Sequence, residues 1–201
     1  LAPWYEGSAA TLYLGGGTPS LLSATQVSEI VKSADLRPGA EVSMEANPGT
    51  VDRDSLAGLR KAGVNRLSLG MQSADDAELQ MLGRLHDAQA AGQAVRAARG
   101  AGFDNLSLDL IFGLPGQELA GWSSSLDAAL GLAPDHLSLY SLTVEDGTLL
   151  EEQIAAGAWT APDADLSADM YELARERLAA AGYWQYEISN YARPSCECRH
   201  N

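Results

Sequence analysis

Residues able to do chemistry gather where predicted strands end. The segment 11–19 (TLYLGGGTP) passes from β-forming residues into Gly15, Gly16 and Gly17, which Thr18 follows. Each glycine costs roughly 0.5–1 kcal/mol of ordering entropy relative to alanine, so three in a row indicate positive φ or a close backbone contact. Their bare amides and carbonyls, beside a hydroxyl, suit the charged end of an amino acid or a phosphate. The simpler alternative is a loose loop between a strand and a helix.

The glycine run differs from two common phosphate-binding motifs. The G-x-G-x-x-G spacing of dinucleotide-binding proteins is absent, and no G-K-[ST] follows as it does in a P-loop. Neither a dinucleotide fold nor a nucleotide triphosphatase is therefore predicted from these glycines.

Further polar side chains stand near other predicted strand exits. Glu45 lies in MEANP, among apolar neighbours, where a carboxylate is costly unless it is paired, so a salt bridge to an arginine is its alternative role. For Gln72 and Asp109 the alternative is a structural hydrogen bond or a helix N-cap. Arg84, in LGRLH, taken alone is expected at the surface, and His86 beside it is expected as a helix cap rather than a ligand.

These residues need a framework of alternating strands and helices. Strands are predicted at residues 11–14, 41–46, 64–70, 105–112 and 136–142, with a sixth at 186–188. Helices are predicted at residues 23–34, from a Ser23 and Gln26 capping box, at 52–63 with Asp52 or Asp54 as cap, from 73–76, and at 88–100, 120–132 and 166–181. Residues 146–165 are the most loop-like internal stretch.

The strand spacing predicts βα units of a parallel α/β sheet. In a barrel, functional side chains lie at the carboxyl ends of several strands, whereas a doubly wound sheet concentrates its ligand contacts at one switch point. Here polar residues stand at four or five successive strand exits. They favour a barrel or partial barrel.

Composition narrows the function classes. The 201 residues carry a net charge of −14, which argues against a nucleic-acid partner because affinity for phosphate backbones comes largely from Lys and Arg. No apolar run is long enough to span a membrane and no secretion signal is visible. The two cysteines, Cys196 and Cys198, form no disulfide framework, so a cytoplasmic location is expected. Because the chain starts at Leu1, we expect a fragment that lacks sequence on both sides.

Six sequence blocks resemble one family. In order they are LYLGGGTPSLL, EANPGT, LSLGMQS, GR-H, LSLDLIFGLPGQ and HLSLYSLTVEDGT. Together they resemble the radical S-adenosylmethionine (radical SAM) proteins of the oxygen-independent coproporphyrinogen III oxidase group, over essentially the whole chain. The resemblance implies a partial (β/α)6 TIM-like barrel with its first strand missing or incomplete. It implies that residues 1–185 form the barrel core and that residues 186–201 begin the connection to a C-terminal HemN-like domain.

The resemblance also implies a cofactor site. In this family the glycine motif, here Gly15, Gly16, Gly17 and Thr18, receives the amino group of S-adenosylmethionine. Its further contacts to the nucleoside and methionine parts fall on four residues of this sequence: Glu45, Gln72, Arg84 and Asp109.

The chain departs from the family at the iron–sulfur cluster. The C-x3-C-x2-C triplet that holds a 4Fe-4S cluster belongs several tens of residues before the glycine motif, and only about ten residues stand there, without cysteine. No metal ligand is therefore expected in this chain. We expect the cluster cysteines upstream of Leu1 in the full-length protein, and the fragment alone to be inactive.

Two branches of the group share these blocks. The end of the chain, YEISNYARPSCECRHN, resembles the haem-chaperone branch, where an H-N-x-x-Y-W motif is associated with haem binding; of it His200 and Asn201 are present. The resemblance implies a haem chaperone that binds haem and S-adenosylmethionine and delivers haem to an unknown acceptor protein. An exposed tail histidine is the alternative for His200, and Cys196 and Cys198 are expected as incidental thiols.

Two other functions stay open. The first is an oxygen-independent coproporphyrinogen III dehydrogenase, which would be a radical SAM oxidoreductase that oxidatively decarboxylates its porphyrinogen. The second, more distant, is a redox-silent βα-barrel lyase. Whether the chain belongs to an enzyme thus depends on the branch.

Overall fold

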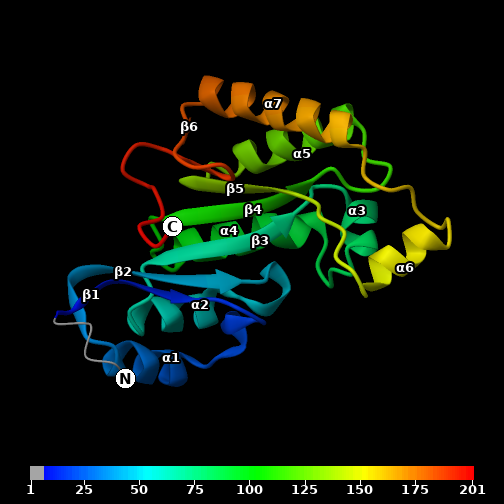
Figure 1. Cartoon of the computed structure of the whole chain (residues 1–201). Coiled ribbons are helices and arrows are strands. Elements are labelled where there is room, and N and C mark those ends of the chain that lie inside the picture. The colour runs from blue at the N-terminus through cyan, green and yellow to red at the C-terminus, as the bar shows by residue number, and fades with distance from the viewer. Residues whose placement is uncertain (1–6) are drawn as a thin grey trace.

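One curved sheet organises the protein. In a computed structural model, which describes residues 7–201, seven strands lie side by side in the order β1-β2-β3-β4-β5-β7-β6 (Figure 1). Their bounds are β1 (Ala9–Leu14), β2 (Leu36–Ala46), β3 (Arg66–Gln72), β4 (Leu106–Phe112), β5 (His136–Ser141), β6 (Trp184–Gln185) and β7 (Asn190–Ala192). Neighbouring strands from β1 to β5 pair in parallel, as the spacing predicts. The α/β sheet curls into a half-barrel, which confirms the predicted partial barrel.

Helices follow the strands along the chain, and most of them cover the outer face of the sheet, whereas the short helix at residues 149–155 stands apart from it (Figure 1). They are α1 (Ala24–Ser33), α2 (Arg53–Lys61), α3 (Asp76–Met81), α4 (Ala88–Gly100), α5 (Leu119–Gly131), α6 (Leu149–Ala155) and α7 (Ala164–Ala180), with short 3-10 turns η1 (Pro19–Leu21) and η2 (Pro48–Thr50). In residues 7–201, none of the helices combines the length and the apolar character that crossing a membrane requires.

Side chains alternate along the parallel strands between an apolar outer face and a polar inner face. Outer residues such as Met44, Leu67 and Leu108 are fully buried in one core with the helices. The inner face carries mostly polar or small residues, namely Tyr13, Glu41, Ser43, Glu45, Arg66, Ser68, Gly70, Ser107, Asp109, His136, Ser138 and Tyr140. Parallel strands are normally apolar on both faces. A polar inner face therefore indicates a solvated or ligand-binding interior.

Local capping signals are confirmed at the first helices and refined at the others. Ser23 and Gln26 form the predicted capping box of α1. Of the two candidates for α2, Asp52 is the cap, through the amide of Ser55. The cap of α4 is Asp87, so the expectation that His86 caps a helix is wrong: its ring is buried instead.

Two expectations about the last third of the chain are wrong. Residues 186–188, predicted as a sixth strand, form the loop between β6 and β7, and β7 runs antiparallel to β5. The stretch 146–165, predicted as loop, contains α6. Short strands and helices of two to seven residues carry too little periodicity to be recognised from sequence.

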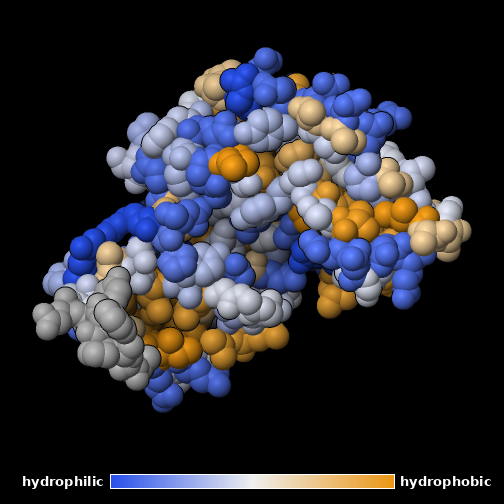
Figure 2. Space-filling view, viewed as in Figure 1, coloured by the Kyte–Doolittle hydropathy of each residue, from blue (hydrophilic) through white to orange (hydrophobic). Residues whose placement is uncertain are grey.

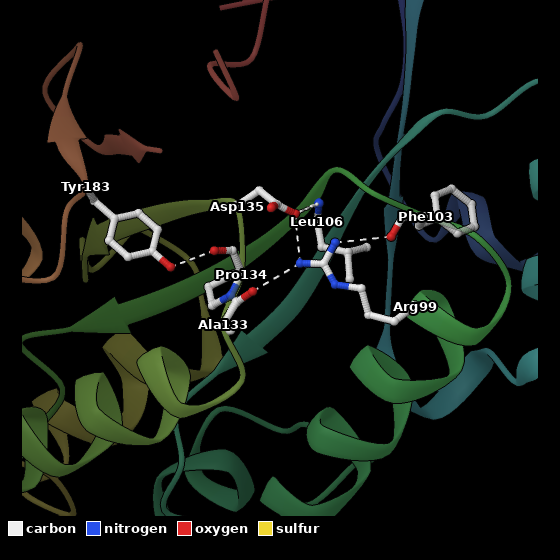
Figure 3. A network of polar contacts seen from close by, with 7 residues as sticks. All are labelled: Arg99, Phe103, Leu106, Ala133, Pro134, Asp135 and Tyr183. Atoms are coloured by element: carbon white, nitrogen blue, oxygen red, sulfur yellow. Dashed lines mark hydrogen bonds and ion pairs between the residues drawn. The ribbon is translucent and has the colours of Figure 1, made fainter. Parts of the chain in front are cut away.

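Arg99, in the last turn of α4, joins the loops that precede β4 and β5 (Figure 3). Its guanidinium donates to the carbonyls of Phe103 at 3.1 Å and Ala133 at 3.0 Å, and it pairs with Asp135 at 2.8 Å. Asp135 also accepts from the amide of Leu106 at 2.9 Å. These contacts satisfy loop carbonyls and hold the start of β4 beside the start of β5, which sets the register of the inner face.

Candidate functional site

The inner face of the half-barrel surrounds a cavity of about 420 Å³. It is lined from β1 to β5, the glycine loop and the C-terminal segment, and Figure 2 shows a hollow on the same face with hydrophilic residues along its edges. Of the residues singled out from the sequence, the cavity brings together Gly17, Thr18, Glu45, Gln72, Arg84 and Asp109. Five separate segments of the chain therefore converge on one space.

Gly15 packs where no side chain fits. A Cβ atom built on Gly15 would lie 2.6 Å from Cε1 of Tyr13 and 3.1 Å from Oε1 of Glu45. The Tyr13 hydroxyl donates to Glu45 Oε1 at 2.7 Å, and the Gly16 amide donates to Oε2 at 3.2 Å. The glycine loop thus holds the Glu45 carboxylate at the cavity. The alternative in which Glu45 pairs with an arginine is wrong for residues 7–201.

Gly16 and Gly17 adopt the left-handed backbone that favours glycine, with φ of +82° and +63°. No heavy atom lies within 4 Å of a Cβ built on either residue. Conformation, rather than crowding, therefore requires glycine there. Thr18 follows with φ of −140° and ψ of 83°, lines the cavity and leaves its hydroxyl out of the cap of η1.

Tyr13, which the sequence analysis did not single out, is the partner that orients Glu45. Burial first, and then the hydrogen bond to Glu45, raise the pKa of Tyr13 well above its ordinary value. The phenol is therefore protonated at every physiological pH and remains a donor to the carboxylate.

Gln72 is held in an uncommon conformation for a residue with a side chain. Its φ is +65°, at an irregularity where the pairing of β3 with β4 shifts, and it is 8% exposed. Its amide nitrogen would lie 2.6 Å from a Cβ built on Gly70, so Gly70 makes room for it. The N-cap role is wrong for Gln72 because Asp75 caps α3. Strained, well-packed residues of this kind occur preferentially at functional sites.

Asp109 lies in the middle of β4, and its side chain reaches the cavity. The Ser68 hydroxyl lies 2.9 and 3.0 Å from its two carboxylate oxygens, and the Ser107 hydroxyl donates at 3.4 Å. Burial raises the pKa of Asp109, while the hydroxyls of Ser138 and Ser68 oppose that shift. The N-cap alternative is wrong. Asp109 is a part-buried acceptor that faces the cavity.

Arg84, between α3 and α4, is half-buried at the cavity rather than on the open surface. Burial lowers the pKa of its guanidinium and the charge of Asp109 opposes that shift. Within residues 7–201 its side chain forms no ion pair. Arg84 is thus a cation available to a ligand. Neighbouring His86 is buried and faces the carbonyl of Met71 at 3.4 Å, and burial lowers its pKa.

The C-terminal segment returns to the first strands (Figure 1). The amide of Arg199 donates to Glu41 on β2 at 3.0 Å. The exposed ring of His200 stacks on Tyr13 with centroids 4.8 Å apart, and its Nδ1 lies 3.3 Å from the hydroxyl of Thr11. His200 is therefore next to the residue that orients Glu45, outside the lining of the cavity. The role of His200 toward haem stays a prediction.

A chain of hydrogen bonds that the sequence analysis missed crosses the deep side of the cavity. The Tyr186 hydroxyl accepts from the amide of Cys198 at 3.1 Å and from Asn201 at 3.3 Å, and so donates to Nε2 of His136 at 2.8 Å. Nδ1 of His136 then donates to Ser107 at 2.8 Å, and Ser107 is bonded to Asp109. The signal that could have found His136 is its polar alternation with Ser138 and Tyr140 in HLSLYS.

His136 gives the stability of the protein a pH dependence that mutation can isolate. Burial first, and then the charge of Arg66, lower its pKa to about 3, against about 6.5 in an unfolded chain. Between these values the unfolded chain binds more protons. The free energy of unfolding therefore falls as the pH drops below about 6.5, by at most roughly 1.4 kcal/mol per pH unit.

We expect His136→Gln to be less stable than the natural protein near neutral pH and to lose less stability on acidification. Urea unfolding at a series of pH values between neutrality and about pH 4 measures both. Parallel stability curves for the two proteins would contradict a neutral, buried His136.

The comparisons with known proteins identify the family of the chain. Residues 2–128 match the family model described as the radical SAM superfamily. The chain is 43% identical over 195 residues to the heme chaperone HemW of Synechocystis sp.. The aligned region covers 95% of this chain and 47% of that protein. It is 44% identical over 195 residues to the mitochondrial radical S-adenosyl methionine domain-containing protein 1 of Bos taurus, with 95% of this chain and 44% of that protein covered.

A solved structure is similar over the same region. The coproporphyrinogen III oxidase HemN of Escherichia coli, described as a radical SAM enzyme, superimposes with a TM-score of 0.82 and 28% sequence identity. The superposition covers 94% of this chain and 44% of that one. The chain spans about half the length of the curated relatives that it matches.

Proposed function

Because the chain belongs to the radical SAM superfamily, we propose that its cavity binds S-adenosylmethionine and that the intact gene product is a HemW-like haem chaperone. The single observation that carries the cofactor proposal is the convergence of Glu45, Gln72, Arg84 and Asp109 with the glycine loop on one cavity. The names of the curated relatives support the chaperone proposal.

The donors and acceptors present suit the parts of S-adenosylmethionine. Its ammonium group needs a carboxylate and carbonyls, which Glu45 and the loop of Gly15, Gly16 and Gly17 provide side by side. Its ribose diol and its methionine carboxylate need acceptors and a cation, and Asp109, Gln72 and Arg84 are such groups. The side chains of this cradle bind and orient the cofactor. Because Tyr13 and the Gly16 amide already hold Glu45, the carboxylate is preorganised for an incoming cation.

The residues of this chain do not fit a 4Fe-4S cluster. Such clusters bind cysteine thiolates, and the sequence has two cysteines, Cys196 and Cys198. Within residues 7–201 no group of three or more metal-binding side chains occurs. The thiol of the buried Cys198 points to Glu41, with Sγ 3.7 Å from Oε1. We propose that cysteines preceding Leu1 in the intact gene product hold the cluster.

The remaining parts of the proposal rest on the sequence resemblance. Residues 186–201 lead from the barrel toward a C-terminal domain, and His200 contributes to haem binding. The partners are haem and an acceptor protein of unknown identity, and the location is cytoplasmic. No charge pattern supports a nucleic-acid partner, given a net charge of −14.

A coproporphyrinogen III dehydrogenase is the second candidate, and the structural similarity to HemN favours it. That similarity rests on 28% identity, whereas the relatives named HemW are 40–44% identical over 95% of the chain. We therefore place the chaperone first. The lyase alternative has no observation in its favour.

Haem titration of the intact gene product tests the chaperone proposal. We expect one equivalent of haem to shift the Soret band, and His200→Ala to weaken that binding by about tenfold or more, as loss of an axial imidazole would. His86→Ala is the matched control, since His86 is buried away from the C-terminal segment. Turnover of coproporphyrinogen III without haem binding would instead establish the dehydrogenase.

A further inference from the structure

We propose that Arg66, which is not among the residues proposed above to contact the cofactor, forms a carboxylate-binding subsite in the cavity. Arg66 stands on the inner face of β3, opposite Ser43 of β2, and lines the cavity. It is 3% exposed, yet its Nε has no hydrogen-bond partner among residues 7–201. A buried guanidinium nitrogen without a partner is costly, so its retention indicates that a ligand completes the site.

No ion pair joins Arg66 to a neighbouring acidic group within residues 7–201, although its charge opposes the rise that burial causes in the pKa of Asp109. The ion pairs of the described chain all lie elsewhere, on α4, α5 and α7. Glu41 accepts from the amide of Arg199 and from Ser43, and Asp109 accepts from Ser68. The charge of Arg66 also acts on His136, whose pKa is lowered first by burial and then by Arg66.

His136 cannot serve as the missing acceptor. Both of its ring nitrogens are occupied, Nε2 by the Tyr186 hydroxyl at 2.8 Å and Nδ1 by Ser107 at 2.8 Å. Arg66 shares the lining of the cavity with two small side chains of the inner face, Ser68 and Ser138.

A carboxylate suits the Arg66 guanidinium in charge and shape. The guanidinium presents a planar fork of N–H donors that matches the two oxygens of a carboxylate, and hydrogen bonds between such charged groups are strong in a buried site. Two sources share this chemistry. One is the carboxylate of the methionine part of S-adenosylmethionine, and the other is a propionate of a haem or porphyrinogen. The second source rests on the proposed function, whereas the subsite itself does not.

The first test reads Arg66 directly and needs neither cofactor. In the intact gene product with ¹⁵N-labelled arginine, the Arg66 Nε–H signal is identified by its loss in Arg66→Lys. We expect acetate, and not the neutral acetamide, to shift this signal in a saturable way. A signal that acetate leaves unmoved would overturn the subsite even if S-adenosylmethionine and haem both bind as proposed.

The second test separates the sources. Decarboxylated S-adenosylmethionine lacks only the carboxylate, and haem dimethyl ester masks both propionates. We expect the natural protein to prefer one parent ligand over its modified form by about 10- to 100-fold, and Arg66→Gln to remove that preference. The ligand pair for which Arg66→Gln no longer distinguishes the parent from the modified form identifies the carboxylate that Arg66 binds. Retained preferences in both pairs would overturn the proposal.

A stability measurement distinguishes this role from a structural one. Because the ligand-free guanidinium is unpaired, Arg66→Gln is expected to melt at the same or a higher temperature than the natural protein. Arg96→Gln, on the exposed side of α4, is the matched control for the substitution itself. A large loss of melting temperature in Arg66→Gln alone would mean that Arg66 is a structural residue.

Discussion

Gly16→Val is expected to abolish measurable S-adenosylmethionine binding while the protein stays folded. Gly16 has a φ of +82°, which costs a residue with a Cβ about 1–2 kcal/mol, and a β-branched residue more. The loop can relieve that strain only by rotating away from positive φ. Rotation withdraws the Gly16 amide from Glu45 and moves the loop carbonyls, so both parts of the ammonium site are lost.

Calorimetric titration of the cluster-reconstituted gene product with S-adenosylmethionine measures the effect. We expect a loss of about 100-fold or more in affinity, equivalent to roughly 3 kcal/mol. Gly182→Val is the matched control, since Gly182 has a φ of +85°, has equally open surroundings and lies after α7. Both variants should lose similar stability, and normal binding by Gly16→Val would refute the backbone contact.

Asp109→Asn is expected to weaken S-adenosylmethionine binding by about 10- to 100-fold, as removal of a charge-assisted hydrogen bond would. The same substitution should leave the stability of the folded protein unchanged or raise it. Burial raises the pKa of Asp109 above that of an unfolded aspartate. The folded state therefore favours the protonated form, and this contribution to stability is lost as the pH rises through the folded pKa.

At neutral pH the ionised Asp109 carboxylate therefore destabilises the folded state, and an uncharged amide in its place avoids this cost. Asp109→Asn should melt at the same temperature as the natural protein or higher, while it binds the cofactor more weakly. Asp104→Asn, at an exposed loop position, is the control for the substitution. Unchanged cofactor affinity in Asp109→Asn would remove Asp109 from the site.

A gain in stability with a loss of binding is the signature expected of a residue kept for its function. Arg66 is expected to behave in the same way, for the opposite charge. Each presents a buried charge to a polar cavity where its own chain satisfies it only in part. A ligand that brings a hydrogen-bond donor to Asp109 and a carboxylate to Arg66 would complete both.

Local sequence determined the elements and much of the site. Alternation in VNRLSLG and NLSLDLIF predicted β3 and β4 because side chains of a strand point in turn to opposite faces. Ser23 and Gln26 predicted the start of α1 because a capping box acts within four residues. The positions of Gly17 and Glu45 at the cavity followed from the strand exits of a parallel sheet, whereas Asp109 lies in the middle of β4.

Only the tertiary structure decided which polar groups are satisfied and which are left for a ligand. Tyr13 and Glu45 are 32 residues apart, and His136 and Tyr186 are 50 apart, so no local pattern links them. The antiparallel β7 and the contact of His200 with Tyr13 likewise arise from the chain folding back on itself. Periodicity assigns a side chain to a face, but burial and partners come from every element packed against that face. For this reason Arg66, an ordinary arginine in the sequence, became a candidate ligand-binding residue only in the folded protein.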